Sequence, residues 1–213
     1  MRVFIFMLIN LGLAFGLGAC APKTPDTKPA PPASENANAA KTWKLDGAQS
    51  SLEFISVKNG AIIETHSFTN LSGAVLADGG AVVLIKLDSV QTNIDIRNER
   101  MKKYLFETDK LQNIMVKTQI NLSKLSALPM GHRAEMDIPV TISMHGKTDT
   151  IDVPMIITHL SENTVVVDSR SPVILDADTF GYGPGIDKLQ ELAKLNSIAH
   201  DIPVMFSLVF AQE

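Results

Sequence analysis

Alternation of apolar and polar side chains with a period of two is the feature that most limits how this chain can fold. Between Arg133 and His145, apolar residues occupy every second position. Successive side chains of a β-strand point to opposite faces, so this run predicts a strand with one dry face and one wet face. The apolar positions are Ala134, Met136, Ile138, Val140, Ile142 and Met144.

Similar runs recur between Trp43 and Phe210, and together they predict about eight strands. Glycine-containing turns at 78–80, 129–131 and 145–146 separate several of them. An all-β domain follows, either an antiparallel barrel or a sandwich. The expected strands are 43–54, the stretch around 68–76, the run with Val83, Ile85 and Leu87, 114–122, 133–145, 151–157, 164–175 and 204–210.

Two segments have helical spacing instead. The stretch from Asn98 to Thr108 and the stretch from Ile186 to Ala199 carry apolar residues three and four positions apart. We expect two short amphipathic helices that plug or cover the ends of the sheet. Four prolines fall inside strand patterns, where each removes a hydrogen-bond donor, so we expect a bulge or imperfect closure: Pro139, Pro154, Pro172 and Pro203.

The N-terminus has the form of a bacterial lipoprotein signal. An apolar run follows Arg2 and ends in Leu17-Gly18-Ala19-Cys20, which contains the chain's single cysteine. The run is too short to span a bilayer. We therefore expect a signal peptide at 1–19 and lipidation at Cys20. Ala21, where an Asp would retain such a lipoprotein at the inner membrane, favours a periplasmic protein anchored to the outer membrane.

The segment 20–40 is rich in proline and has no apolar period, which is typical of a tether. The rest, 41–213, is long enough for one domain with its own core. The chain has a net charge of −4 and no basic block, so it is a poor candidate for binding nucleic acid. Membrane attachment is expected through the acyl chains.

The sequence shows no common catalytic or metal-binding motif, and we expect no enzyme activity, no cofactor and no metal site. Its five histidines are scattered, and we expect them to be exposed or hydrogen-bonded. The glycines of 181–185 predict a turn that leads into a helix rather than a phosphate cradle, since Pro184 lacks a free amide. The charged residues between 88 and 100 alternate in sign, which favours a solvated turn or a local ion-pair network over an acid–base pair. They are Asp88, Asp95, Arg97, Glu99 and Arg100.

Four short motifs, in order, resemble the YceI family of periplasmic, lipocalin-like polyisoprenoid-binding proteins. These motifs are Trp43-Lys44-Leu45-Asp46 with Ser50 and Phe54, then Ser89-Val90-Gln91-Thr92 with Arg97-Asn98-Glu99-Arg100-Met101, then the hairpin 140–148, and Phe180-Gly181. Asn93, Asn98, Arg100, Ala177 and Thr179 depart from the residues usual in that family. These departures fall on polar positions, so the resemblance supports an isoprenoid-like tail of the ligand more than any particular head group.

The resemblance implies an antiparallel, lipocalin-like barrel whose lumen holds an isoprenoid-type lipid. An eight-stranded barrel can hold one slender ligand, and a Met-rich apolar lumen suits a branched chain. At roughly 0.8 kcal/mol per carbon, burying ten carbons would contribute about 8 kcal/mol before association costs. The lumen candidates are Phe54, Ile85, Met101, Leu105, Val116, Met136, Ile138, Val140, Ile142, Met144, Met155, Phe180 and Phe206.

The sequence therefore predicts a lipid-anchored periplasmic barrel that binds a polyisoprenoid or quinone-like amphiphile and carries, buffers or presents it. A different class stays open, in which the apolar stripes pack a dry core. The domain would then be a non-enzymatic interaction module that docks a membrane partner through a sheet edge. Period-two burial is the same in both cases.

Overall fold

The structure, a computed structural model, describes residues 42–212. The expected signal peptide at 1–19, the lipidation at Cys20 and the tether at 20–40 lie outside the described residues and stay predictions. Within residues 42–212, no helix has both the length and the apolar character needed to cross a membrane.

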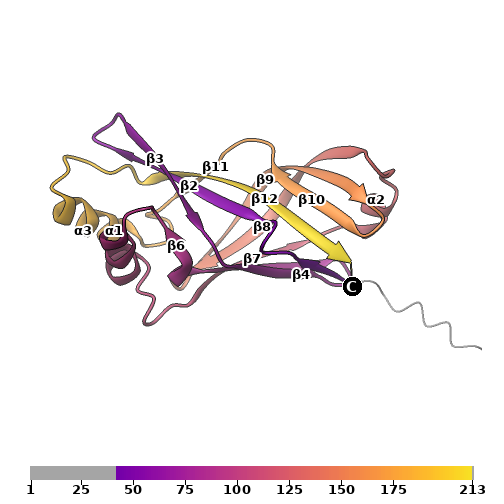
Figure 1. Cartoon of the computed structure of the whole chain (residues 1–213), viewed down its shortest axis with the longest axis horizontal. Coiled ribbons are helices and arrows are strands. Elements are labelled where there is room, and N and C mark those ends of the chain that lie inside the picture. The colour runs from indigo at the N-terminus through magenta and orange to yellow at the C-terminus, as the bar shows by residue number, and fades with distance from the viewer. Residues whose placement is uncertain (1–41, 213) are drawn as a thin grey trace, which may run out of the picture. The chain divides into compact units, whose positions relative to one another are not determined.

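Eight antiparallel strands close into a barrel, so the predicted lipocalin-like fold is confirmed (Figure 1). The barrel closes because β1 pairs with β4 on one side and with the end of β12 on the other. In circuit order the strands are β1 (Trp43–Leu45), β4 (Leu71–Val75), β5 (Gly80–Lys86), β7 (Asn113–Gln119), β8 (Arg133–Met144), β9 (Lys147–Ser161), β10 (Thr164–Ser169) and β12 (Asp201–Gln212).

Strand β12 extends beyond the closed circuit and carries additional strands. Its first half pairs with β2 (Ser51–Lys58) on one side and with β11 (Val173–Asp176) on the other. Strand β2 pairs in turn with β3 (Ile62–Phe68), and β3 pairs with the short β6 (Val90–Gln91). Figure 1 shows the β2–β3 hairpin at the helical end of the barrel, and β4 and the end of β12 at the opposite end.

Two of the expected strands are each divided into two, which corrects the sequence prediction. In the stretch 43–54, the Asp46 carboxylate accepts hydrogen bonds from the Ala48 and Gln49 amides and turns the chain between β1 and β2. The stretch 164–175 separates into β10 and β11, with Pro172 just before β11. The stretch around 68–76 holds β4 and only the last residue of β3, most of which was not expected as a strand. A side-chain period does not reveal such interruptions.

The alternation of β8 is confirmed, because Val140, Ile142 and Met144 are buried while the residues between them are partly exposed. The expected strand 114–122 is too long, since β7 ends at Gln119. Leu122 begins a short helix, α2 (Leu122–Ser126), because the Asn121 side chain caps it by accepting a hydrogen bond from the Lys124 amide. Leu87 lies in a single 3₁₀ turn, η1 (Leu87–Ser89), rather than in the strand before it.

Both expected amphipathic helices are present, with shifted bounds. The first begins earlier, as α1 (Asp95–Arg100), and continues as a π-helical turn, η2 (Met101–Leu105). The second is α3 (Gly183–Ala193), which starts at the predicted glycine turn with Pro184 in its first turn. It ends at Lys194, whose left-handed φ of 52° stops the helix. A Cβ on Gly185 would lie 2.8 Å from the Tyr104 carbonyl oxygen, so glycine there allows α3 to pack on η2.

Three of the four prolines lie where one ladder of a strand ends. Pro139 precedes the β8 residues that pair with β7, Pro154 precedes the β9 residues that pair with β10, and Pro203 precedes the β12 residues that pair with β2. Each proline therefore lies outside the ladder on one side of its strand, where no amide is needed. The barrel closes, and its one register shift between β9 and β10, at Thr164 and Val165, involves no proline.

Candidate functional site

A cavity of about 580 Å³ lies inside the barrel. Packed protein interiors have few voids larger than a water molecule, and sites for small molecules measure about 300 to 1,000 Å³. The wall is almost entirely apolar and takes side chains from β2 around the barrel to β12 and from the helices α1 and α3. The barrel therefore encloses a cavity large enough for a small molecule rather than a close-packed core.

Most of the predicted lumen residues line this cavity. Val140, Ile142 and Met144 contribute from β8, as the alternation predicts. Whether the residues of this wall contact a lipid stays a prediction. The eleven of the thirteen that line the cavity are Phe54, Ile85, Met101, Leu105, Val116, Val140, Ile142, Met144, Met155, Phe180 and Phe206.

Met136 and Ile138 do not line the cavity, so for these two the predicted position is wrong. Ile138 is buried and Met136 half-buried, and both pack with the hydrophobic core. They lie on the part of β8 before Pro139, where β8 no longer pairs with β7. A regular alternation gives the face that a residue occupies but not the point along the strand at which the cavity ends.

The helices contribute more to the wall than the sequence indicates. We expected them to cover the ends of the sheet, whereas Ile186 and Leu189 of α3 face the cavity. Ile94 and Ile96, beside the start of α1, also line it although they are 46% and 54% exposed. The apolar lining therefore continues to the outer surface here, and we call this opening the mouth.

A row of six aromatic rings forms one part of the cavity's surroundings. From one end to the other, neighbouring ring centroids lie 5.2, 5.4, 5.5, 5.8 and 4.8 Å apart. Such tilted and stacked contacts add to the burial energy and restrict side-chain motion. The rings belong, in order, to His66, Phe54, Phe68, Phe106, Tyr182 and His145.

Tyr182, near the end of this row, has a buried hydroxyl without a hydrogen-bond partner within the described part of the chain. Burial raises the pKa of the phenol well above its ordinary value, so the group stays protonated. A neutral hydroxyl donor in an apolar wall is stabilised if a bound molecule brings an acceptor. This residue was not singled out from the sequence.

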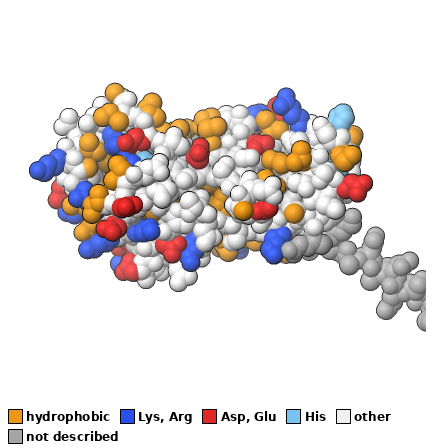
Figure 2. All heavy atoms as spheres, in the orientation of Figure 1, with side chains coloured by type: hydrophobic (Ala, Val, Ile, Leu, Met, Phe, Trp, Pro, Cys, Tyr) orange, Lys and Arg blue, Asp and Glu red, His pale blue; other side chains and the backbone are white. Residues whose placement is uncertain are grey.

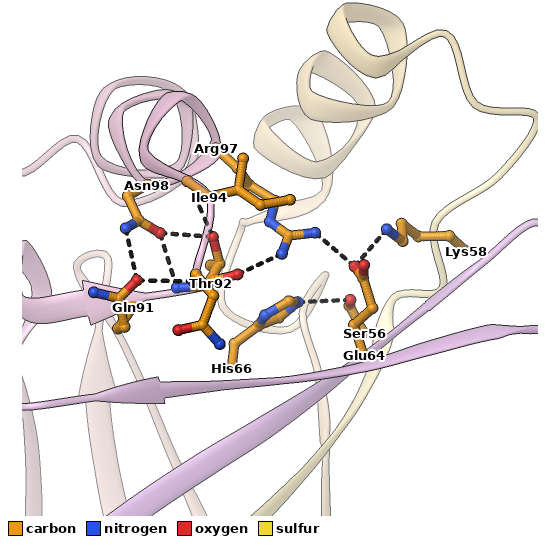
Figure 3. A network of polar contacts seen from close by, with 10 residues as sticks. Ser56, Lys58, Glu64, His66, Gln91, Thr92, Ile94, Arg97 and Asn98 are labelled. Atoms are coloured by element: carbon orange, nitrogen blue, oxygen red, sulfur yellow. Dashed lines mark hydrogen bonds and ion pairs between the residues drawn. The ribbon is translucent and has the colours of Figure 1, made fainter.

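A polar network lies where β2, β3 and α1 meet (Figure 3). The Glu64 carboxylate accepts a 2.6 Å hydrogen bond from Arg97 and forms an ion pair with Lys58, which lowers its pKa. The Arg97 guanidinium also donates to the Thr92 carbonyl oxygen over 2.6 Å. Behind it, the side-chain Oδ1 of the buried Asn98 accepts hydrogen bonds from the Thr92 hydroxyl at 2.6 Å and from the Thr92 backbone amide at 2.9 Å.

This network corrects the interpretation of 95–100 as a solvated or local cluster. The carboxylate that pairs with Arg97 belongs to Glu64 in β3, and not to Asp95 or Glu99. The sequence does not indicate this contact because the partner lies in another strand.

His66 lies beside this network, and it is buried to 4% exposure. One ring nitrogen, Nε2, lies 2.9 Å from the Ser56 hydroxyl oxygen, whereas Nδ1 has no described partner. Burial and then the nearby Arg97 charge lower its pKa to about 4, so the ring is neutral at physiological pH. In serine hydrolases a third group orients the histidine that contacts the serine. The Ser56–His66 contact has no such group among the described residues, because the Glu64 carboxylate is held by Lys58 and Arg97 and His66 Nδ1 has no partner.

Polar contacts join three elements around the mouth, which are the β2–β3 hairpin, α1, and α3 with the loop that follows it. The Glu64–Arg97 contact joins the β2–β3 hairpin to α1, and Arg100 of α1 donates to the Leu192 carbonyl oxygen of α3 over 3.3 Å. The side-chain Oδ1 of Asn59 accepts hydrogen bonds from the backbone amides of Asn196 and Ser197 at 2.9 and 3.3 Å, which joins the hairpin to the loop after α3. The mouth therefore has a polar frame around an apolar passage.

The other four histidines are exposed or only partly buried. His145 lies 3.4 Å from Glu107, and His200 lies 2.8 Å from Asp178. Among residues 42–212, no group of three or more His, Cys, Asp and Glu side chains is placed to hold a metal ion.

Comparisons with known proteins agree with this geometry. The model of the YceI-like domain matches residues 43–210. A polyisoprenoid binding domain from Saccharophagus degradans, implicated in plant cell wall breakdown, is 35% identical, with a TM-score of 0.79 over 80% of this chain and 98% of that one.

Two more distant structures share the fold. Burkholderia cenocepacia BcnA is 19% identical, with a TM-score of 0.60 over 78% of this chain and 98% of its own. A Campylobacter jejuni YceI protein is 14% identical, with a TM-score of 0.51 over 70% and 84%. A comparison with curated proteins gives no match.

Proposed function

The chain belongs to the YceI-like domain family, and from this we propose that it binds one isoprenoid-type lipid in the barrel and carries, buffers or presents it. The single observation that carries the proposal is the apolar cavity of about 580 Å³. A close-packed core would leave no such space. The cavity therefore favours a binding protein over the alternative of an interaction module with a dry core.

The shape of the wall supports a long apolar tail with a polar head. Its polar side chains gather at the mouth, where Ser56, His66 and Arg97 lie, while the barrel interior offers mostly Ile, Val, Met and Phe. A tail in such a lumen gains affinity from burial alone, at about 0.8 kcal/mol per carbon. A head with hydrogen-bond acceptors, such as a quinone-like ring, suits the donors of Arg97 and Tyr182.

We also propose that the domain is held at a membrane by acylation of Cys20, in the periplasm and at the outer membrane. The support is the Leu17-Gly18-Ala19-Cys20 motif and the proline-rich segment after it. Attachment through two or three acyl chains leaves the barrel free to bind its ligand.

Native mass spectrometry of the purified full-length protein, before and after solvent extraction, tests the binding proposal. The expected spectrum shows a lipid adduct of about one molecule per chain that extraction removes and that added lipid restores. A protein that carries no lipid from the cell and takes up none of the added polyprenol or quinone would contradict it.

A further inference from the structure

We propose that the mouth docks directly onto an anionic lipid bilayer through four exposed isoleucines. Ile62 and Ile63 lie at the tip of the β2–β3 hairpin and are 49% and 67% exposed, while Ile94 and Ile96 beside α1 are 46% and 54% exposed. The Glu64–Arg97 contact ties the hairpin to α1, so both pairs flank the same opening. Large apolar side chains clustered on a surface mark a contact with a membrane or with a protein.

Continuity with the cavity favours a membrane over a protein. Ile94 and Ile96 are exposed and also line the cavity, so one apolar surface runs from the outside into the barrel. Ala193, also exposed, extends this lining from the end of α3. An apolar ligand that leaves a bilayer along this path does not have to cross water, where exposing it would cost about 0.8 kcal/mol per carbon. This step rests on the proposed lipid-binding function.

The charge around the mouth fits an anionic surface. Residues 94–105 hold four basic side chains and two acidic ones, Asp95 and Glu99, within a chain of net charge −4. One of the basic side chains, Arg97, is paired with Glu64, and the others are Arg100, Lys102 and Lys103. Figure 2 shows hydrophobic and basic side chains intermingled at the end that carries α1 and α3, with acidic side chains among them. Apolar groups inserted between cations are the usual means by which a protein surface holds to anionic lipid.

A pair of tryptophan reporters tests the contact. In full-length protein with Trp43→Phe, tryptophan is placed either at Ile63 or at Met130, which is 60% exposed on the 129–131 turn away from the mouth. The proteins are mixed with vesicles of phosphatidylethanolamine and phosphatidylglycerol whose acyl chains carry bromine, a contact quencher. We expect strong quenching of the Ile63→Trp reporter and little of the Met130→Trp reporter. Equal quenching, or stronger quenching at Met130, would overturn the proposal.

A double variant separates docking from ligand binding. Ile62 and Ile63 lie outside the cavity wall, so Ile62→Ser with Ile63→Ser should leave the lipid content in native mass spectra unchanged. Transfer of lipid between vesicles should slow by at least about tenfold, since each isoleucine loses its burial in the bilayer. Met130→Ser with Leu160→Ser is the matched control, with 60% and 57% exposure in the parent side chains.

The outcomes distinguish the two proposals. Unchanged transfer by the isoleucine variant, with lipid still bound, would reject docking and leave lipid binding intact. A wild-type protein that binds no lipid in native mass spectra would instead reject the proposed function. Docking that is equally strong on neutral phosphatidylcholine vesicles would reject the electrostatic part.

Discussion

A substitution at Ile142 most clearly distinguishes an open lumen from a packed core. It is 7% exposed, it pairs with Val116 of β7, and both side chains line the cavity. We expect Ile142→Trp to fill space that the lipid tail uses and to lower lipid retention about tenfold. The free energy of unfolding without ligand should stay nearly unchanged, because the ring enters open volume. Native mass spectrometry and urea unfolding measure the two quantities.

Thr141→Trp is the control for this prediction. Thr141 lies on the other face of β8, where its hydroxyl is 3.0 Å from that of Thr150. Overpacking of a close-packed core costs about 1 to 3 kcal/mol. A loss of that size in Ile142→Trp, beside a stable Thr141→Trp protein, would show that the cavity is not available to a ligand.

His66 makes stability depend on pH. Its pKa is about 4 in the folded protein and 6.5 when unperturbed, so between these values the unfolded chain binds a proton that the folded chain does not. Stability is therefore constant above about pH 6.5 with respect to this group, and falls by up to roughly 1.4 kcal/mol per pH unit on acidification towards pH 4. Urea unfolding at several pH values measures this slope.

Replacement of the His66 imidazole tests whether this residue causes the pH dependence of stability. We expect His66→Gln to flatten the slope between about pH 6.5 and 4, and the exposed His132→Gln to leave it in place. A slope that persists in the His66→Gln protein would assign the pH dependence to other groups.

At the scale of the elements, the mouth depends on contacts between β3, α1 and α3. Glu64 is the central one, because its carboxylate holds both Arg97 and Lys58. We expect Glu64→Gln to loosen the hairpin from α1 and to accelerate release of bound lipid up to about fivefold, since a partly exposed pair contributes under about 1 kcal/mol. Transfer of lipid to acceptor vesicles measures the rate.

Glu135→Gln provides a matched loss of charge. Glu135 pairs with Arg170 at 3.3 Å on the outer surface of the barrel, and neither residue lines the cavity. Equal release rates for Glu64→Gln and Glu135→Gln would mean that the tie at the mouth does not limit lipid release.

The same elements show how far sequence reasoning reaches. The hairpin of β8 and β9 was predictable, because the alternation of Val140, Ile142 and Met144 is a local signal that burial on one face imposes. The mouth was not, because its contacts join residues far apart in the chain, such as Glu64 with Arg97 and Asn59 with Asn196. Polar side chains carry no period, so a single sequence does not indicate their partners.

At the scale of the whole molecule, the first described strand and the mouth lie at different ends of the barrel. The described chain enters the barrel at β1, whose Trp43 pairs with Gln212 at the end of β12, opposite α1 and α3 in Figure 1. With roughly 60 Å of reach in an extended proline-rich segment of 20 residues, the proposed tether is long enough for the mouth to meet a bilayer.

Cys20 is the residue on which the proposed attachment depends. We expect Cys20→Ala to move the protein out of the detergent-dependent membrane fraction, or to leave it uncleaved at the inner membrane, because no acyl chain can be added. Fractionation with mass analysis of the N-terminus measures both. A wild-type protein whose Cys20 proves to be unmodified would end the lipoprotein proposal, while lipid binding by the barrel would stand.

The pairing of Trp43–Leu45 with Phe210–Gln212 also fixes when the barrel can form. A ribosome makes the first of these segments long before the last, so the growing chain can pair β1 with β4 but not with β12, and it has no closed interior. Contacts between distant segments make folding slow, and they leave the unclosed strands exposed to aggregation. A chain that stays open until its last strand is made is suited to passing through a narrow translocation channel. For the exported, lipid-binding protein proposed above, closure and lipid uptake would then begin only on the far side of the membrane.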